Sequence, residues 1–235
     1  MANEKNQNIR RAPAPRGKFF FLFVFLLAEL AVYPWERYDS KFSPWFRVLN
    51  VLVTISSVYA VSFRRITWVV AAVIAAPVAF HRVLLHEIPA SKVQLAGALL
   101  GIAFDIFIII VIFRRAFQTR EVTSDAIYGA VSIYLLIGFT FMRIYTLLVS
   151  FQPGAFYLDP LLNHHTLPVQ ADMFYYSFVT MTSLGAVGIS PASDQARAIS
   201  VVESVIGILY LGVLVSRLIA AYRSPENLDG LNPPG

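Results

Sequence analysis

The feature that most limits what this chain can fold into is a series of six long apolar stretches. They cover residues 19–33, 46–63, 66–85, 94–113, 126–151 and 196–222. The last five are 18–27 residues long, and a helix needs about 20 residues to cross a bilayer. The first contains Glu29 and ends without a small-residue cleavage pattern, which favours a retained helix over a signal peptide. The sequence therefore predicts an all-α membrane protein with six transmembrane helices.

Composition excludes several classes of function. The chain is 57% hydrophobic and 14% charged, whereas soluble domains average about 45–50% and 25%. This leaves little room for a large soluble catalytic domain. The absence of cysteine excludes disulfides, thiolate metal sites and cysteine nucleophiles. Because metalloprotease, serine-hydrolase and P-loop patterns are also missing, we predict a protein that is not an enzyme and needs no chemical cofactor.

The distribution of Lys and Arg sets the expected orientation. With the N-terminus in the cytoplasm, twelve of the nineteen basic residues lie on the cytoplasmic side and six on the opposite side, while Arg143 lies inside a stretch. The positive-inside rule then places both termini in the cytoplasm. This bias explains the formal charge of +5 without a nucleic-acid partner. Short loops and the missing cysteines favour a plasma membrane, and more specifically a bacterial inner membrane.

The segment between the last two stretches differs from the other connections. Residues 152–195 contain a polar part, then an apolar run at 173–181 that is too short to span, then the Gly-containing sequence SLGAVG. Such a run predicts a re-entrant segment, which is tolerated where it lines a cavity or is buried in protein. A row of backbone carbonyls repeated by symmetry around an axis can replace the hydration shell of a cation.

The sequence FVTMTSLGAVGISP at 178–191 resembles the pore signature of potassium channels, T-x-T-T-V-G-Y-G-D-I-x-P. The aromatic run FYYSF at 174–178 resembles the pore helix, and Gly207 lies 22 residues after Gly185, where the family has a hinge glycine. The resemblance covers residues 126–222 and implies a homotetramer in a lipid bilayer, with permeating K⁺ or Na⁺ as its ligands. It assigns the ion filter to Thr182, Ser183, Leu184, Gly185, Ala186, Val187 and Gly188.

Three filter positions depart from the family pattern. Ala186 replaces the aromatic residue, Val187 the second glycine and Gly188 the aspartate. A β-branched residue rarely adopts φ > 0, so we expect Val187 not to take the glycine geometry. The outer two ion sites should then be missing or remodelled, while the carbonyls of residues 183–185 could still form an inner pair. This predicts a cation pore with reduced or altered potassium selectivity.

Four charged residues stand out in the interior of the apolar stretches, where charges are costly and often functional. Arg143 and Glu203 flank the expected pore at similar depth, so they could pair and support its wall; alternatively Arg143 could snorkel or bind a backbone carbonyl. Glu29 and Asp105 could be proton-sensitive or simply protonated and hydrogen-bonded. The stretch 94–113 has no ladder of basic residues, which argues against steep voltage gating.

Other assignments remain open from the sequence. His164 and His165, beside Asp159, could bind a divalent ion, sense external pH or simply be solvated. Gly207 is a candidate gating hinge, and close helix packing is its alternative. The expected domains are a basic cytoplasmic tail at 1–18, a peripheral four-helix domain at 19–113, a linker at 114–125, the pore domain at 126–222 and a tail at 223–235.

Three other functions fit parts of the pattern. One is a fully potassium-selective channel whose filter tolerates Ala186 and Val187. Another is a non-conducting structural or sensing subunit. The third is a transporter that couples to protons through Glu29, Asp105 or Glu203.

Overall fold

The computed structural model describes residues 17–33, 43–63, 65–80, 91–118, 123–163 and 165–222. Their regular structure consists of seven helices and two short strands. In chain order these are α1 (Lys18–Val32), α2 (Ser43–Ala60), α3 (Arg65–Phe80), α4 (Ser91–Gln118), α5 (Ser124–Phe151), β1 (Phe156–Leu158), α6 (Gln170–Met181), β2 (Ile189–Pro191) and α7 (Asp194–Tyr222). The basic N-terminal tail before residue 17, His81, His86, His164 and the tail from residue 223 lie outside the described residues.

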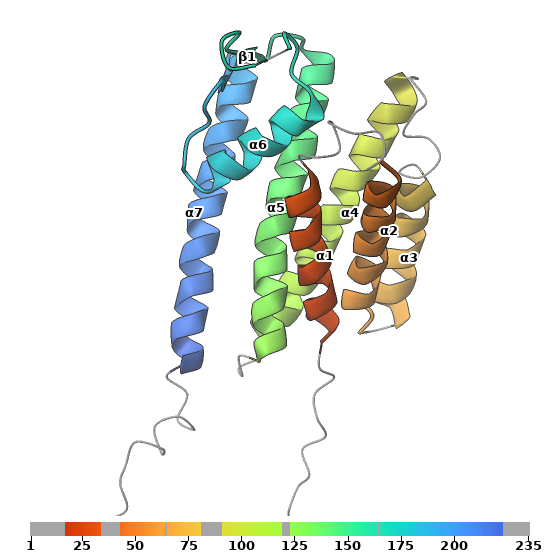
Figure 1. Cartoon of the computed structure of the whole chain (residues 1–235). Helices are drawn as coiled ribbons and strands as arrows, with labels where there is room; N and C mark the ends of the chain where they lie inside the picture. Colours follow the sequence, from red (N-terminus) through yellow and green to blue (C-terminus); the bar gives the residue numbers. More distant parts are fainter. Residues whose placement is uncertain are drawn as a thin grey trace, which may run out of the picture.

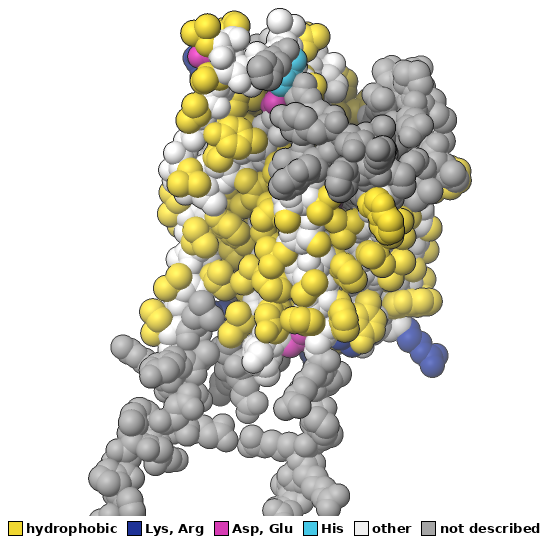
Figure 2. All heavy atoms as spheres, in the orientation of Figure 1, with side chains coloured by type: hydrophobic (Ala, Val, Ile, Leu, Met, Phe, Trp, Pro, Cys, Tyr) yellow, Lys and Arg dark blue, Asp and Glu magenta, His cyan; other side chains and the backbone are white. Residues whose placement is uncertain are grey.

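Several of the helices have the length and apolar character of membrane spans. Three helices qualify over Leu95–Ala116, Ser124–Phe151 and Asp194–Arg217, and two shorter apolar helices run over Val48–Ala60 and Arg65–Phe80. In Figure 2, hydrophobic side chains cover the middle of the visible face, and the coloured charged side chains gather towards its two ends. The chain is therefore an integral membrane protein.

Helix α5 occupies the centre of the molecule. It packs against α1 and α4 on one side and against α6 and α7 on the other (Figure 1). Accordingly, 56% of its span is buried, compared with 28% for α4 and for α7. The helix begins at an N-cap, Thr123, whose hydroxyl accepts a hydrogen bond of 3.2 Å from the Ala126 N–H, as expected of a threonine at this position.

The connection between α5 and α7 folds back between these two helices. Its helix α6 is only 12 residues long and lies in the same half of the molecule as the two strands (Figure 1). The strands pair in antiparallel orientation, with Tyr157 opposite Ser190. The apolar run at 173–181, predicted to be too short to span, lies within α6, so the expected short helix is confirmed.

Candidate functional site

The start of α6 is held by an acidic residue in its first turn. The Asp172 carboxylate accepts the Val169 N–H at 2.8 Å and contacts His165 Nε2 at 2.7 Å. A carboxylate here satisfies an otherwise unpaired backbone donor and interacts favourably with the helix dipole. His165 thus pairs with the acidic residue that caps α6, whereas its neighbour His164 lies outside the described residues.

The aromatic run of α6 anchors the helix in the core. The Phe174 ring stacks on Tyr33 of α1 with centroids 4.3 Å apart, and Phe178 meets Phe139 of α5 at 5.3 Å. Tyr176 is buried, but the neighbouring Tyr175 is 41% exposed. Because successive helical residues point about 100° apart, the run buries one face of α6 and leaves Tyr175 on another.

The end of α6 is a Schellman motif, a common way to terminate a helix. The Ser183 N–H donates to the Thr180 carbonyl at 3.0 Å, and the Leu184 N–H donates to the Val179 carbonyl at 2.9 Å. Ser183 adopts φ = 60°, the left-handed conformation that glycine usually adopts at this position. For a residue with a side chain this conformation costs roughly 1–2 kcal/mol more than for glycine. The Thr182 hydroxyl donates back to the Phe178 carbonyl at 2.7 Å. The first two predicted filter residues therefore also terminate α6.

The next five residues connect this cap to β2. Gly185 and Gly188 both have φ = 80°. The prediction that Val187 avoids positive φ is confirmed, since Ser183 is the one non-glycine residue with positive φ in the described part of the chain. The Leu184 and Val187 side chains are 78% and 71% exposed in the single chain. Positive φ thus recurs after three residues, at Gly185 and Gly188, and not after two as in the family pattern.

Three hydrogen bonds hold the outer half of this segment. The Val187 N–H donates to the Tyr175 hydroxyl at 3.1 Å. The Gly188 carbonyl accepts the Asp159 N–H at 2.9 Å and the Asn163 side-chain amide at 2.7 Å. A β-carbon on Gly188 would lie 3.2 Å from the Asn163 amide nitrogen, so both the conformation and the space favour glycine here.

Glu203 of α7 lies behind α6 in a cluster of hydroxyl groups. Its carboxyl group is 2.6 Å from the Tyr145 hydroxyl and 2.5 Å from the Ser177 hydroxyl. Ser200, hydrogen-bonded to Tyr176 at 2.7 Å, extends the cluster. Glu203 is fully buried and joins α5, α6 and α7. The cluster therefore connects α6 to both flanking helices.

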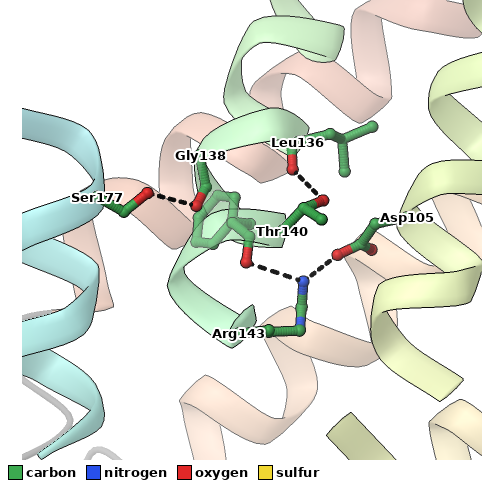
Figure 3. A network of polar contacts seen from close by, with 7 residues as sticks. Asp105, Leu136, Gly138, Thr140, Arg143 and Ser177 are labelled. Carbon is green, nitrogen blue, oxygen red and sulfur yellow. Dashed lines mark hydrogen bonds and ion pairs between the residues drawn. The ribbon is translucent and has the colours of Figure 1, made fainter. Parts of the chain in front are cut away.

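Arg143 does not pair with Glu203, in contrast to the pairing considered from the sequence. Its guanidinium forms an ion pair with Asp105 of α4 and also lies 3.5 Å from the Phe139 carbonyl. Figure 3 shows Arg143 pointing towards α4 while Ser177 of α6 donates to the Gly138 carbonyl on another side of α5. Arg143 therefore connects the peripheral helices to α5, and the backbone-carbonyl contact weighed as its alternative is present.

The Asp105–Arg143 pair is largely removed from solvent. The Asp105 and Arg143 side chains are 4% and 14% exposed. Glu29 of α1, which is 3% exposed, lines the same small cavity. The two acidic residues of the peripheral helices therefore lie near one basic residue supplied by α5.

Gly207 lies where α7 crosses the end of α6. A β-carbon at Gly207 would be 2.8 Å from the Met181 Cγ and 3.2 Å from its carbonyl carbon. Helix α7 continues through this position without interruption. Close packing, the alternative to a hinge, therefore accounts for this glycine in the described conformation, and a role in gating stays a prediction.

Comparison with known proteins identifies the C-terminal third of the chain. Residues 144–224 match a family model described as an ion channel. This segment is an ion channel domain. No curated protein and no solved structure matches the chain. Because an ion channel moves ions without chemical change, the prediction that the protein is not an enzyme is confirmed.

The ion channel domain begins in the second half of α5 and includes both strands, α6 and α7. It contains the seven predicted filter residues, Glu203 and Gly207, while Arg143 precedes it by one residue. Within the described residues, no group of three or more His, Asp or Glu side chains could hold a metal ion.

Sequence reasoning missed four polar residues that the fold brings to this domain. Tyr145 and Ser177 bind Glu203, and Tyr175 and Asn163 bind the predicted filter segment, residues 182–188. Tyr145 and Ser177 could have been found from their hydroxyl groups within apolar helices, because buried polar groups require hydrogen-bond partners. Tyr175 was within the quoted aromatic run, and Asn163 lies in a loop without a motif.

Proposed function

We propose that the chain is one subunit of a homotetrameric monovalent cation channel with reduced or altered potassium selectivity. The observation that carries this proposal is the backbone of residues 183–188, which follows a capped re-entrant helix and has positive φ at Ser183, Gly185 and Gly188 but not at Val187. Alternating signs of φ turn consecutive carbonyls to one side, whereas an extended strand alternates them. The inner part of the filter keeps that alternation, and its outer part loses it.

The resemblance of this segment to the potassium-channel pore supports a fourfold assembly. One subunit contributes a single row of carbonyls, and a cation needs a ring of them to replace its water. Closed cyclic symmetry supplies that ring. Leu184 and Val187 are highly exposed in one subunit, which agrees with neighbouring subunits packing around this segment.

The remaining features of the proposal concern topology and gating. Six spanning helices, with both termini in the cytoplasm of a plasma membrane, agree with the Lys and Arg distribution. Helix α4 carries Asp105 in its apolar part and Arg114 and Arg115 near its end, so it lacks the repeated positive charges that would move in a membrane field. Steep voltage gating through α4 is therefore not proposed.

The test is the reversal potential of the purified tetramer in planar bilayers with K⁺ on one side and Na⁺ on the other. A value close to zero is expected for a poorly selective pore. A value at the potassium limit would refute the selectivity argument, and silence from intact tetramers would favour a non-conducting subunit. As a matched variant, the triple substitution Ala186→Tyr, Val187→Gly and Gly188→Asp restores the family pattern and should raise the preference for K⁺.

A further inference from the structure

The outer half of the filter segment has lost its side-chain brace. Ala186 has only a methyl group, and Val187 is 71% exposed. Fixing the backbone of one residue costs roughly 1–2 kcal/mol in conformational entropy, so this stretch needs other anchors to keep one conformation. Two side chains among the described residues provide such anchors, the Tyr175 hydroxyl and the Asn163 amide, and the Asp159 backbone N–H adds a third hydrogen bond.

The Tyr175 contact determines the direction of one carbonyl. A trans peptide group is planar, with its C=O pointing opposite to its N–H, and the described peptide bonds are all trans. The Val187 N–H points to Tyr175 on α6. The Ala186 carbonyl, on the other side of the same peptide group, must therefore point away from α6, towards the open side of the segment.

The Asn163 contact turns the carbonyl of Gly188 in the opposite direction. The Gly188 carbonyl accepts from both the Asn163 amide and the Asp159 N–H, so it is turned towards the outer loop. The Asn163 amide also donates to the Asp159 carbonyl at 2.9 Å. An amide nitrogen carries two hydrogens, and these two contacts use both, which fixes the orientation of the side chain.

We propose that Tyr175 and Asn163 are positioning residues that decide which outer carbonyls of the filter face the ions. Tyr175 directs the Ala186 carbonyl into the ion path, and Asn163 withdraws the Gly188 carbonyl from it. This inference rests on the proposed cation-channel function and extends it. The row of ion-binding carbonyls then continues past Gly185 to Ala186 and ends before Gly188.

The two residues are suited to this role because their own supports are rigid. Tyr175 is on a helix that is capped by Asp172 at one end and by the Schellman motif at the other. Asn163 belongs to a turn in which Asp159 accepts the N–H groups of Leu161 and Asn163. A brace on rigid elements restrains a flexible segment more effectively than one on another loop.

The experiment compares Tyr175→Phe with Tyr157→Phe as the matched control, because Tyr157 is an exposed tyrosine of β1. Permeability ratios of K⁺ to Na⁺ are measured from reversal potentials of purified tetramers, and amide hydrogen exchange at Val187 is followed in the same preparations. We expect Tyr175→Phe to change the ratio by about two- to tenfold, the effect of losing one neutral hydrogen bond, and to speed exchange at Val187. The control should change neither.

A second variant keeps the test valid if Tyr175→Phe does not assemble. Asn163→Leu retains a similar shape without the two side-chain donors. It should also change the ratio, because the Gly188 carbonyl is then held by the Asp159 N–H alone. A conducting wild type with an unchanged ratio in the assembled variants would overturn this inference alone. A wild-type tetramer that passes no current would instead overturn the proposed function, and the inference with it.

Discussion

The strongest single expectation concerns the protonation of Glu203, which follows from counting hydrogens. Ser177 Oγ lies 2.8 Å from the Gly138 carbonyl oxygen and 2.5 Å from a Glu203 oxygen. A hydroxyl group carries one hydrogen, so it cannot donate to both acceptors. If Ser177 donates to Gly138, the hydrogen between Ser177 and Glu203 must come from the carboxyl group. Glu203 is then a neutral acid that donates to Ser177 and accepts from Tyr145.

The surroundings of Glu203 agree with a neutral form. None of the ion pairs found among the described residues includes Glu203, and the side chain is fully buried. Burying a charge without a partner of opposite charge is expensive. A carboxylic acid that has a hydroxyl acceptor on one oxygen and a hydroxyl donor on the other avoids that cost.

Two substitutions of Glu203 that are similar in size should therefore have different effects on the free energy of unfolding. In Glu203→Gln the amide N–H can donate to Ser177 and the carbonyl can accept from Tyr145, so the free energy of unfolding should change by less than about 1 kcal/mol. In Glu203→Leu the Tyr145 hydroxyl loses its acceptor and keeps only Ser200 at 3.5 Å. One unsatisfied buried hydroxyl costs about 1–3 kcal/mol, which is the expected loss for the leucine variant.

The assay is unfolding of the purified protein in detergent micelles, followed by helical circular dichroism as denaturant is added. Infrared difference spectra between wild type and Glu203→Gln provide an independent measurement, because a neutral acid has a carbonyl stretch that a carboxylate lacks. The reasoning would be refuted if glutamine were as destabilising as leucine, or if that band were absent. An ionised carboxylate with two charge-assisted bonds, each worth about 1.5–3 kcal/mol, would produce that outcome.

Two further predictions address packing within the membrane. Asp105→Asn should lower the free energy of unfolding by about 3–5 kcal/mol, because it leaves the Arg143 charge buried without its acid; adding Arg143→Gln should recover part of this loss, and strictly additive losses in denaturant titrations would contradict a direct pair. Gly207→Ala should destabilise the protein by about 1–3 kcal/mol through overpacking against Met181. The control, Gly212→Ala, has open space in the subunit and should be neutral or slightly stabilising in the same denaturant titration.

The positions of the longest helices along the chain could be predicted from apolar length. The stretch 126–151 corresponds to α5 (Ser124–Phe151), and the stretch 196–222 corresponds to α7 (Asp194–Tyr222). Inside a lipid bilayer no water is available to hydrogen-bond backbone N–H and C=O groups, so an apolar stretch of this length forms a helix. The backbone of Val187 was also predictable, since the steric limit on a β-branched residue is local.

The way in which the filter segment is held could not be predicted. Ser183 has a left-handed backbone conformation that the sequence does not indicate, because the residue is not a glycine. The conformation is imposed by the two hydrogen bonds that end α6. Tyr175 and Val187 are twelve residues apart, and Asn163 and Gly188 are twenty-five apart. Contacts at these separations depend on the path of the connection between α5 and α7, which motif spacing does not determine.

The partner of Arg143 shows a different limit of sequence reasoning. Its depth in the membrane can be counted along the chain, and by depth Glu203 was a suitable partner. The direction of a side chain depends on the rotation of its helix, and two residues of separation turn it by about 200°. Arg143 therefore faces α4 and Asp105, while Tyr145 faces α7 and Glu203. These two buried acid contacts lie on opposite sides of α5, so this helix connects the peripheral helices to α6 and α7 through polar contacts on both faces.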